Sequence, residues 1–185
     1  MHDIEPFYNW QDLYNSSEDE RSPFFNAFHD EFNYRNKVYN YYIHPLWDEI
    51  GSETLYAKLL FADYEEGFCI LEFIGEWNDC INNDIMFLKR DIIEPLENQG
   101  IQNFILIWEH VFNFHGSDDC YYEEWYEEIK NEQGSIFFIN MQKPVMDEIK
   151  LFGIQHFVNL GPDFQDINWR KMNPMDLMEF VASKT

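Results

Sequence analysis

The amino-acid sequence predicts a single α/β domain built on a mixed sheet. Two apolar, alternating runs separated by a short turn signal indicate an antiparallel pair of strands, and the segments after them alternate between strand-like and helix-like patterns. No internal repeat or low-complexity tract interrupts this order. With 185 residues, of which 45% are hydrophobic, the chain is long enough to bury one core of ordinary size.

The N-terminal segment, residues 1–45, differs from the rest because aromatic residues are spread through an acidic background with little helical period. Disordered segments are poor in aromatic residues, so we expect an arm that packs on the domain formed by residues 46–185. SSEDERSP at 16–23 is the expected loop of this arm. KVYNYYI at 37–43 alternates as a strand does, and Pro45 closes it.

The middle of the chain begins with a predicted hairpin and a helix. TLYAKLLFADY (54–64) and FCILEFIG (68–75) are predicted strands on either side of an EEG turn. From Asn82 the apolar residues recur with a period near 3.6, which predicts a helix that ends at Gly100, with Pro95 removing one hydrogen bond near its end. The predicted inward positions of this helix are Ile85, Leu88, Ile92 and Leu96.

The remaining segments alternate between strand and helix towards the C-terminus. Continuous apolar runs predict strands buried on both faces, and glycine and proline mark the helix ends. The predicted strands are NFILIW (103–108), SIFFIN (135–140) and IQHFVNL (154–160). The predicted helices are 119–134, with Tyr122, Trp125, Tyr126 and Ile129 inward, 145–153, opened by Pro144, and 175–182, capped by Asn173 and Pro174.

Three segments in this order carry a resemblance to a known family. They are ILEFIGEWND (70–79), LENQGIQNFILIW (96–108) and MQKPVMDEIKLFGIQHFVNL (141–160). They resemble, in turn, the second strand, the helix with its glycine and buried strand, and the closing helix and strand of the STAS domain, the family of anti-sigma-factor antagonists and sulphate-transporter tails. The resemblance covers about residues 54–160 and implies a STAS-like core of order β-β-α-β-α-β-α-β-α.

The resemblance also implies a regulatory serine. In the STAS family, the loop after the buried strand carries an Asp-Ser-Ser-Gly motif whose serine is phosphorylated to control partner binding. The corresponding stretch here is HGSDD (115–119), in which only Ser117 matches. The blocks NYYIHP, DYEEG, GEWND and EEWYEE also resemble a set of full-length bacterial proteins of unassigned function, which implies no activity.

The charge balance restricts the partners. The chain has 35 acidic and 12 basic residues and a formal net charge of -23, so it repels nucleic acid and anionic membranes and favours a basic protein or a divalent cation. Three cysteines without a CxxC pair, and no signal-peptide pattern, predict a cytoplasmic protein with reduced thiols. No stretch approaches the roughly 20 apolar residues that span a bilayer.

The polar residues before the acidic helix have two interpretations. Ser117 is placed as its N-cap, with Asp118 and Asp119 in the first turn, where negative charge suits the helix dipole. The alternative is a phosphorylated Ser117. Its phosphate would share the favourable field of the helix N-terminus with the two aspartates and be repelled by them.

The helix itself suggests a docking surface. Residues 117–132 hold seven acids and one lysine, and like charges recur at four-residue spacing, which is unfavourable unless a cation is supplied. We therefore expect a non-enzymatic module of STAS-like type that docks a basic partner. The predicted partner-binding residues are Ser117, Asp118, Asp119, Tyr121, Glu123, Glu124, Trp125, Glu127 and Glu128.

The competing interpretation is a metal-dependent hydrolase. His110, His115, Asp118 and Asp119 follow a buried strand, at the end of the sheet where α/β proteins usually bind ligands, and imidazole with carboxylate can hold zinc, manganese or iron. The sequence has no GxSxG elbow and no glycine-rich phosphate loop, so no other cofactor is expected. A homo-oligomer completed by the aromatic arm is a third expectation.

Overall fold

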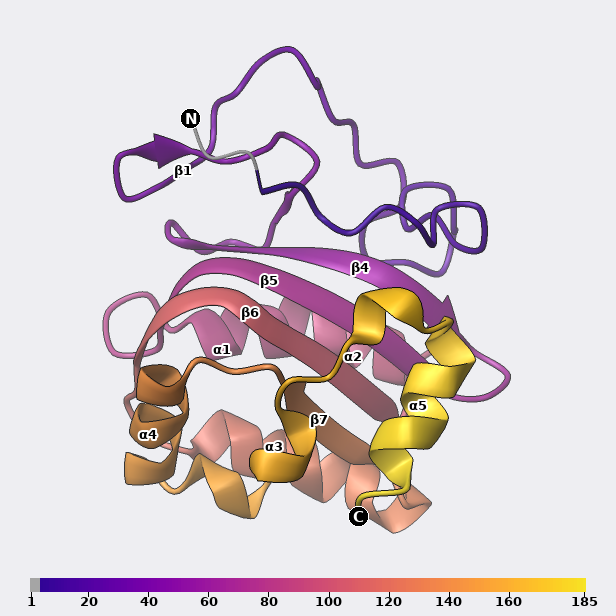
Figure 1. The fold of residues 1–185 in the computed structure, drawn as a ribbon, viewed down its shortest axis with the longest axis vertical. Helices are drawn as coiled ribbons and strands as arrows, with labels where there is room; N and C mark the ends of the chain where they lie inside the picture. Colours follow the sequence, from indigo (N-terminus) through magenta and orange to yellow (C-terminus); the bar gives the residue numbers. More distant parts are fainter. Residues whose placement is uncertain (1–3) are drawn as a thin grey trace.

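A five-stranded mixed sheet organises the computed structural model, which describes residues 4–185 (Figure 1). The strand order is β3-β4-β5-β6-β7, with β3, β4 and β5 antiparallel and β5, β6 and β7 parallel. Helices cover both faces, so the α/β class is confirmed. The strands are β3 (Asp48–Glu49), β4 (Leu55–Asp63), β5 (Phe68–Asn78), β6 (Asn103–His115) and β7 (Ser135–Ile139).

The predicted hairpin forms between β4 and β5. The Asp63 Oδ1 atom accepts hydrogen bonds from the backbone N–H groups of Glu65 and Glu66, both 3.0 Å long, which closes the turn. Further along β5, Gly75 has a φ of +126°, and a Cβ atom there would lie 2.0 Å from the backbone oxygen of Thr54. Glycine at this position therefore lets the two backbones approach closely.

The predicted helix after β5 forms with an irregular centre. It consists of α1 (Asp84–Leu88), a π-helical segment η1 (Lys89–Ile93) and α2 (Glu94–Glu97). Pro95 has no N–H group, and its ring would clash with the carbonyl four residues earlier, inside η1. The wider π turn accommodates the proline without ending the helix.

The other helices close the two layers. They are α3 (Cys120–Ile129) with the 3₁₀ turn η2 (Lys130–Glu132), α4 (Lys143–Leu151), three short 3₁₀ turns, η3 (Ile154–His156), η4 (Pro162–Phe164) and η5 (Trp169–Lys171), and α5 (Pro174–Ala182). Asn173 caps α5 as predicted, because its side chain accepts a 2.9 Å hydrogen bond from the backbone N–H of Asp176.

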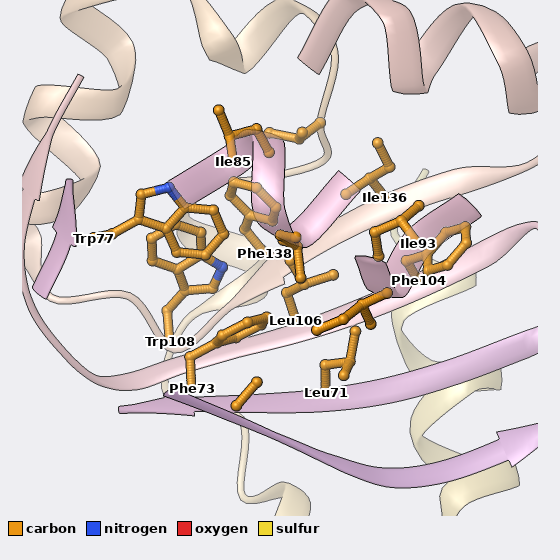
Figure 2. Packing of buried hydrophobic residues seen from close by; sticks show 14 of the residues in the cluster. Leu71, Phe73, Trp77, Ile85, Ile93, Phe104, Leu106, Trp108, Ile136 and Phe138 are labelled. Atoms are coloured by element: carbon orange, nitrogen blue, oxygen red, sulfur yellow. The ribbon is translucent and has the colours of Figure 1, made fainter. Parts of the chain in front are cut away.

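One face of the sheet packs against α1, α3 and α4. In this layer, the indole rings of Trp77 on β5 and Trp108 on β6 stack with centroids 4.4 Å apart, and Phe73 and Phe138 lie beside them (Figure 2). All four side chains are fully buried. This layer is the largest apolar cluster of the described residues.

The opposite face packs against the C-terminal segment and part of the N-terminal arm. Leu177 and Val181 of α5 are fully buried against this face, and Trp169 lies with them. The ring of Trp10, from the arm, lies 5.6 Å from the ring of Trp169, and its indole N–H donates a 3.1 Å hydrogen bond to the backbone oxygen of Met172. Trp10 of the arm and the C-terminal segment are therefore packed together on one side of the sheet.

Two predicted strands are wrong. Residues 37–43 form a small hairpin, β1 (Lys37–Val38) with β2 (Tyr41–Tyr42), because Tyr39 adopts a left-handed φ of 54° and reverses the chain. Residues 154–160 form η3 and a single bridge between Asn159 and Phe137 instead of a strand. Within residues 4–185, no helix has the length and apolar character needed to cross a membrane.

Candidate functional site

The stretch predicted to hold the site begins inside a strand. Strand β6 extends to His115, so only Gly116 to Asp119 connect it to α3. Ser117 is exposed and does not cap the helix, which corrects the predicted N-cap. Instead, the Asp118 carboxylate accepts a 3.1 Å hydrogen bond from the backbone N–H of Cys120, and Asp119 occupies the N-cap position.

A buried aspartate fixes the position of α3. Asp79, in the turn after β5, accepts hydrogen bonds from the Trp77 indole N–H at 2.8 Å, from the Ile85 backbone N–H at 2.9 Å and from the Tyr122 hydroxyl at 2.8 Å. Burial raises the pKa of Asp79 to about 6. The GEWND block therefore joins β5, α1 and α3 through one carboxyl group.

The inward face of α3 includes a residue expected to contact a partner. Tyr122, Trp125 and Ile129 are buried in the core, as the helical period predicts. Trp125 is 0% exposed, so its ring cannot anchor a partner at the surface, and that expectation is corrected. Tyr121 is half-buried, and its ring lies 5.6 Å from the Arg90 guanidinium.

Several acids of α3 have partners within the chain. Arg90 donates two 3.0 Å hydrogen bonds to the Glu124 carboxylate. The Lys89 ammonium pairs with Glu128, and Lys130 pairs with Glu127. The helix is therefore partly neutralised by cations from η1 and η2, in contrast to the uncompensated helix expected from the sequence.

An acidic groove lies between α2 and α3. Its volume is about 380 Å³, and four glutamates line it: Glu94, Glu97, Glu128 and Glu132. The cation that pairs with three of them is Lys89, whose side chain is fully buried and lies 3.3 Å from the carboxylate of Glu94 and 3.5 Å from that of Glu97. Negative charge therefore exceeds positive charge along the groove.

The pKa shifts in the groove reflect this excess. Burial, together with the Glu128 charge, raises the pKa of Glu97 to about 7, while Lys89 opposes the shift. Burial lowers the pKa of Lys89, but its hydrogen bond to Glu128 and the charges of Glu97 and Glu94 raise that pKa above its ordinary value. The Oε1 atom of Glu97 is buried and has no hydrogen-bond partner among the described residues.

The residues of the predicted metal site are not brought together. The Nε2 atom of His110 lies 3.9 Å from the Glu72 carboxylate, and that of His115 lies 3.2 Å from the Glu76 carboxylate. Both histidines belong to β6, and a strand rises about 3.3 Å per residue, so the five-residue separation places their backbones too far apart for one coordination sphere. The expected set of His110, His115, Asp118 and Asp119 is corrected on this ground.

Three glutamates elsewhere have carboxylate oxygens close enough together to bind one metal ion. Within residues 4–185, oxygen atoms of Glu94, Glu124 and Glu128 lie within 4.8 Å of one another. Arg90 pairs with Glu94 and Glu124, and Lys89 pairs with Glu94 and Glu128. These cations already supply the positive charge that an ion would bring.

Sequence reasoning missed a second polar network, on the opposite face of the sheet. Glu72 is fully buried, accepts a 2.9 Å hydrogen bond from the Phe7 backbone N–H, and lies 3.3 Å from the Arg170 guanidinium. Burial raises the pKa of Glu72 to about 7. Arg170 also pairs with Glu109, which accepts a 2.9 Å hydrogen bond from the Trp169 indole and a 2.7 Å bond from Asn140.

This network stabilises packing. Burial raises the pKa of Glu109, but the hydrogen bonds from Arg170, Trp169 and Asn140 hold it below its ordinary value. The donors come from the arm, from Asn140 directly after β7 and from η5, and the acceptors come from β5 and β6. The one sequence signal was a glutamate inside an otherwise apolar strand, ILEFIG, since a charge buried in a sheet requires partners.

Compared with models of known protein families and with curated proteins, the chain matches none of them.

Proposed function

We propose that the protein is a non-enzymatic binding module of the STAS-like, regulatory type, which docks a basic segment of a partner protein in the groove between α2 and α3. One observation carries the proposal: four glutamates line this groove around a single buried lysine. Glu123 and Glu127 of α3 are also exposed, and Glu127 pairs with Lys130. A lysine or arginine of the partner offsets the repulsion between these acids.

The form of the groove supports a protein segment as the ligand. Its lining is largely polar, and the negative charge of its four glutamates is offset by a lysine or arginine of the partner. The regulatory part of the proposal rests on Ser117, which is exposed beside the start of α3. A phosphate on Ser117 adds negative charge beside the start of α3, at the opposite end of the helix from Glu128, and so extends the acidic surface for a basic segment long enough to reach both ends.

The experiment must separate the groove from the general negative charge of the chain. The probe is a fluorescein-labelled peptide of alternating lysine and serine, titrated with the full-length protein at about 0.15 M salt, where charges beyond roughly 8 Å are screened. The double variant Glu128→Gln, Glu132→Gln removes two groove charges. The matched control Glu18→Gln, Glu20→Gln removes two charges from the exposed arm loop.

We expect the groove variant to bind the peptide about tenfold more weakly than the wild type, and the arm variant to bind it with unchanged affinity. Fluorescence anisotropy gives the affinities, and far-ultraviolet circular dichroism verifies that both variants are folded. Equal weakening by the two variants would mean that the peptide follows net charge alone, and the groove would then be rejected as a docking site.

A further inference from the structure

A cavity lies where the N-terminal arm crosses the sheet, away from the acidic groove. Its volume is about 220 Å³, and it is lined by arm residues on one side and by β4 residues Lys58, Leu59 and Leu60 on the other. Since a cavity of about 150 Å³ in a protein interior accommodates benzene, this one holds a molecule of about six to ten non-hydrogen atoms. The exposed side chains of Gln11, Asn15 and Glu31 form its rim.

One residue that lines this cavity has a buried hydroxyl group without a partner. Ser16 is 2% exposed and lines the cavity, and its Oγ atom has no hydrogen-bond partner among the described residues. Buried hydroxyl groups in folded proteins nearly always have a partner, since leaving one unpaired is unfavourable. The neighbouring Ser17, in contrast, donates a 2.9 Å hydrogen bond to the Asn15 side chain. Ser16 is therefore available to a ligand.

Two basic side chains line the cavity, Lys58 from β4 and His29 from the arm. The Lys58 ammonium is largely buried and lies 2.9 Å from the Asp48 carboxylate, and the His29 ring lies 2.5 Å from the other oxygen of Asp48. Asp48 is thus shared between two basic side chains. An ammonium group has three donors, so Lys58 retains donors for an acceptor in the cavity after its contact with Asp48.

Part of the lining is apolar. Pro6, Phe7, Leu46 and Leu60 line the same cavity as Ser16 and Lys58. A ligand that satisfies both sides has one small anionic head and a short hydrocarbon tail. The acidic rim residue Glu31 and the net charge of -23 disfavour anions with more than one charge, such as phosphate.

We propose that this cavity binds a small monocarboxylate, whose carboxylate accepts hydrogen bonds from Lys58 and Ser16 and whose tail packs against Phe7 and Leu60. The site is independent of the acidic groove. Because one wall is the arm and the other is β4, the bound molecule joins the two.

The test uses the full-length protein with sodium butyrate as the probe, at constant ionic strength and pH 7, with sodium phosphate as a second probe. Isothermal titration calorimetry measures binding, and thermal unfolding in the absence of the probe measures stability. The variants are Ser16→Ala and Lys58→Met. Ser22→Ala is the matched control, because Ser22 is also a buried serine of the arm, but its hydroxyl accepts a 3.0 Å hydrogen bond from the Phe24 backbone N–H.

The two serine substitutions are expected to change the unfolding temperature in opposite directions. Ser16→Ala should weaken butyrate binding about tenfold or more and raise the unfolding temperature, because it removes a buried hydroxyl that has no partner in the free protein. Ser22→Ala should lower the unfolding temperature and leave the butyrate affinity unchanged. Lys58→Met should abolish binding, and if it also loosens the arm, the Ser16→Ala result alone decides.

Three results would overturn the proposal. The first is no saturable binding of butyrate to the wild type. The second is equal affinity of Ser16→Ala and the wild type for butyrate. The third is binding of phosphate as tight as that of butyrate, which would make the cavity a general anion site and remove the role given to its apolar wall.

Discussion

Asp79 illustrates how a single residue holds several elements together in this protein. Its carboxyl group accepts three hydrogen bonds, from β5, α1 and α3, and burial keeps its pKa high. Each donor offsets part of the cost of burying the carboxyl group, so the loss of one donor leaves that cost uncompensated. The position of the acidic helix therefore depends on a contact beneath it, with the hydroxyl of Tyr122.

We predict that Tyr122→Phe lowers the free energy of unfolding by about 1–3 kcal/mol, because the Asp79 carboxyl group loses a donor in a buried environment. Urea denaturation followed by circular dichroism measures the change. Tyr121→Phe is the matched control, since Tyr121 is half-buried on the same helix, and it should change the stability by less than about 0.5 kcal/mol. Equal effects at the two positions would contradict the role given to Asp79.

At the scale of elements, the sequence predicted the strands and the helix cap that are determined by residues close together in the chain. The alternation in β4 and β5 and the Asn173 cap of α5 depend on residues a few positions apart, and the structure has them as predicted. The strand predicted at 37–43 is wrong because Tyr39 adopts a left-handed backbone conformation. The alternation of residue types in this segment does not indicate that conformation. Tyrosine adopts such a backbone conformation only where the surroundings compensate the strain.

The contacts that place the candidate sites could not be predicted in this way. Arg170 pairs with Glu109 and with Glu72, which are 61 and 98 positions away in the sequence. Lys89 and Arg90 reach the acids of α3 only because η1 packs beside it. The sequence indicated an acidic helix, but the cations that partly neutralise it lie on another element, and charge spacing within one helix says nothing about them.

The C-terminal elements should depend on Arg170. This residue joins η5 to β5 and β6, so Arg170→Met leaves Glu72 and Glu109 without their shared cation. We expect a loss of about 2 kcal/mol in the free energy of unfolding, measured by urea denaturation. Lys171→Met is the control, because Lys171 is exposed and forms no ion pair with another described residue. A stability loss of the same size in the control would contradict this account.

At the scale of the whole molecule, buried carboxyl groups give stability a definite pH dependence. Burial raises the pKa values of Glu72 and Glu97 to about 7 and that of Asp79 to about 6. For a raised carboxyl pKa, the folded state binds the proton more tightly than the unfolded chain does. The stabilisation is complete below the unfolded pKa of about 4 and is lost as the pH rises through 6 to 7.

We therefore predict that the unfolding temperature is higher at pH 5 than at pH 7.5. Glu97→Gln should raise the unfolding temperature at pH 7.5 and reduce its change between the two pH values, because the amide replaces a carboxyl group whose ionisation is opposed by burial and by Glu128. Differential scanning calorimetry at both pH values tests this. Glu65→Gln, in the exposed turn before β5, is the control, and a similar reduction there would contradict the assignment to Glu97.

The tryptophans give the molecule an optical property that follows from its packing. All six of them are buried: Trp10, Trp47, Trp77, Trp108, Trp125 and Trp169. Indole emission shifts to longer wavelengths when water reaches the ring, so the folded chain emits at short wavelength and unfolding shifts the whole signal. Trp10 lies in the arm and Trp47 at the sheet edge, whereas the stacked rings of Trp77 and Trp108 lie in the central layer. Replacing the tryptophans of one group at a time therefore distinguishes detachment of the arm from opening of the core.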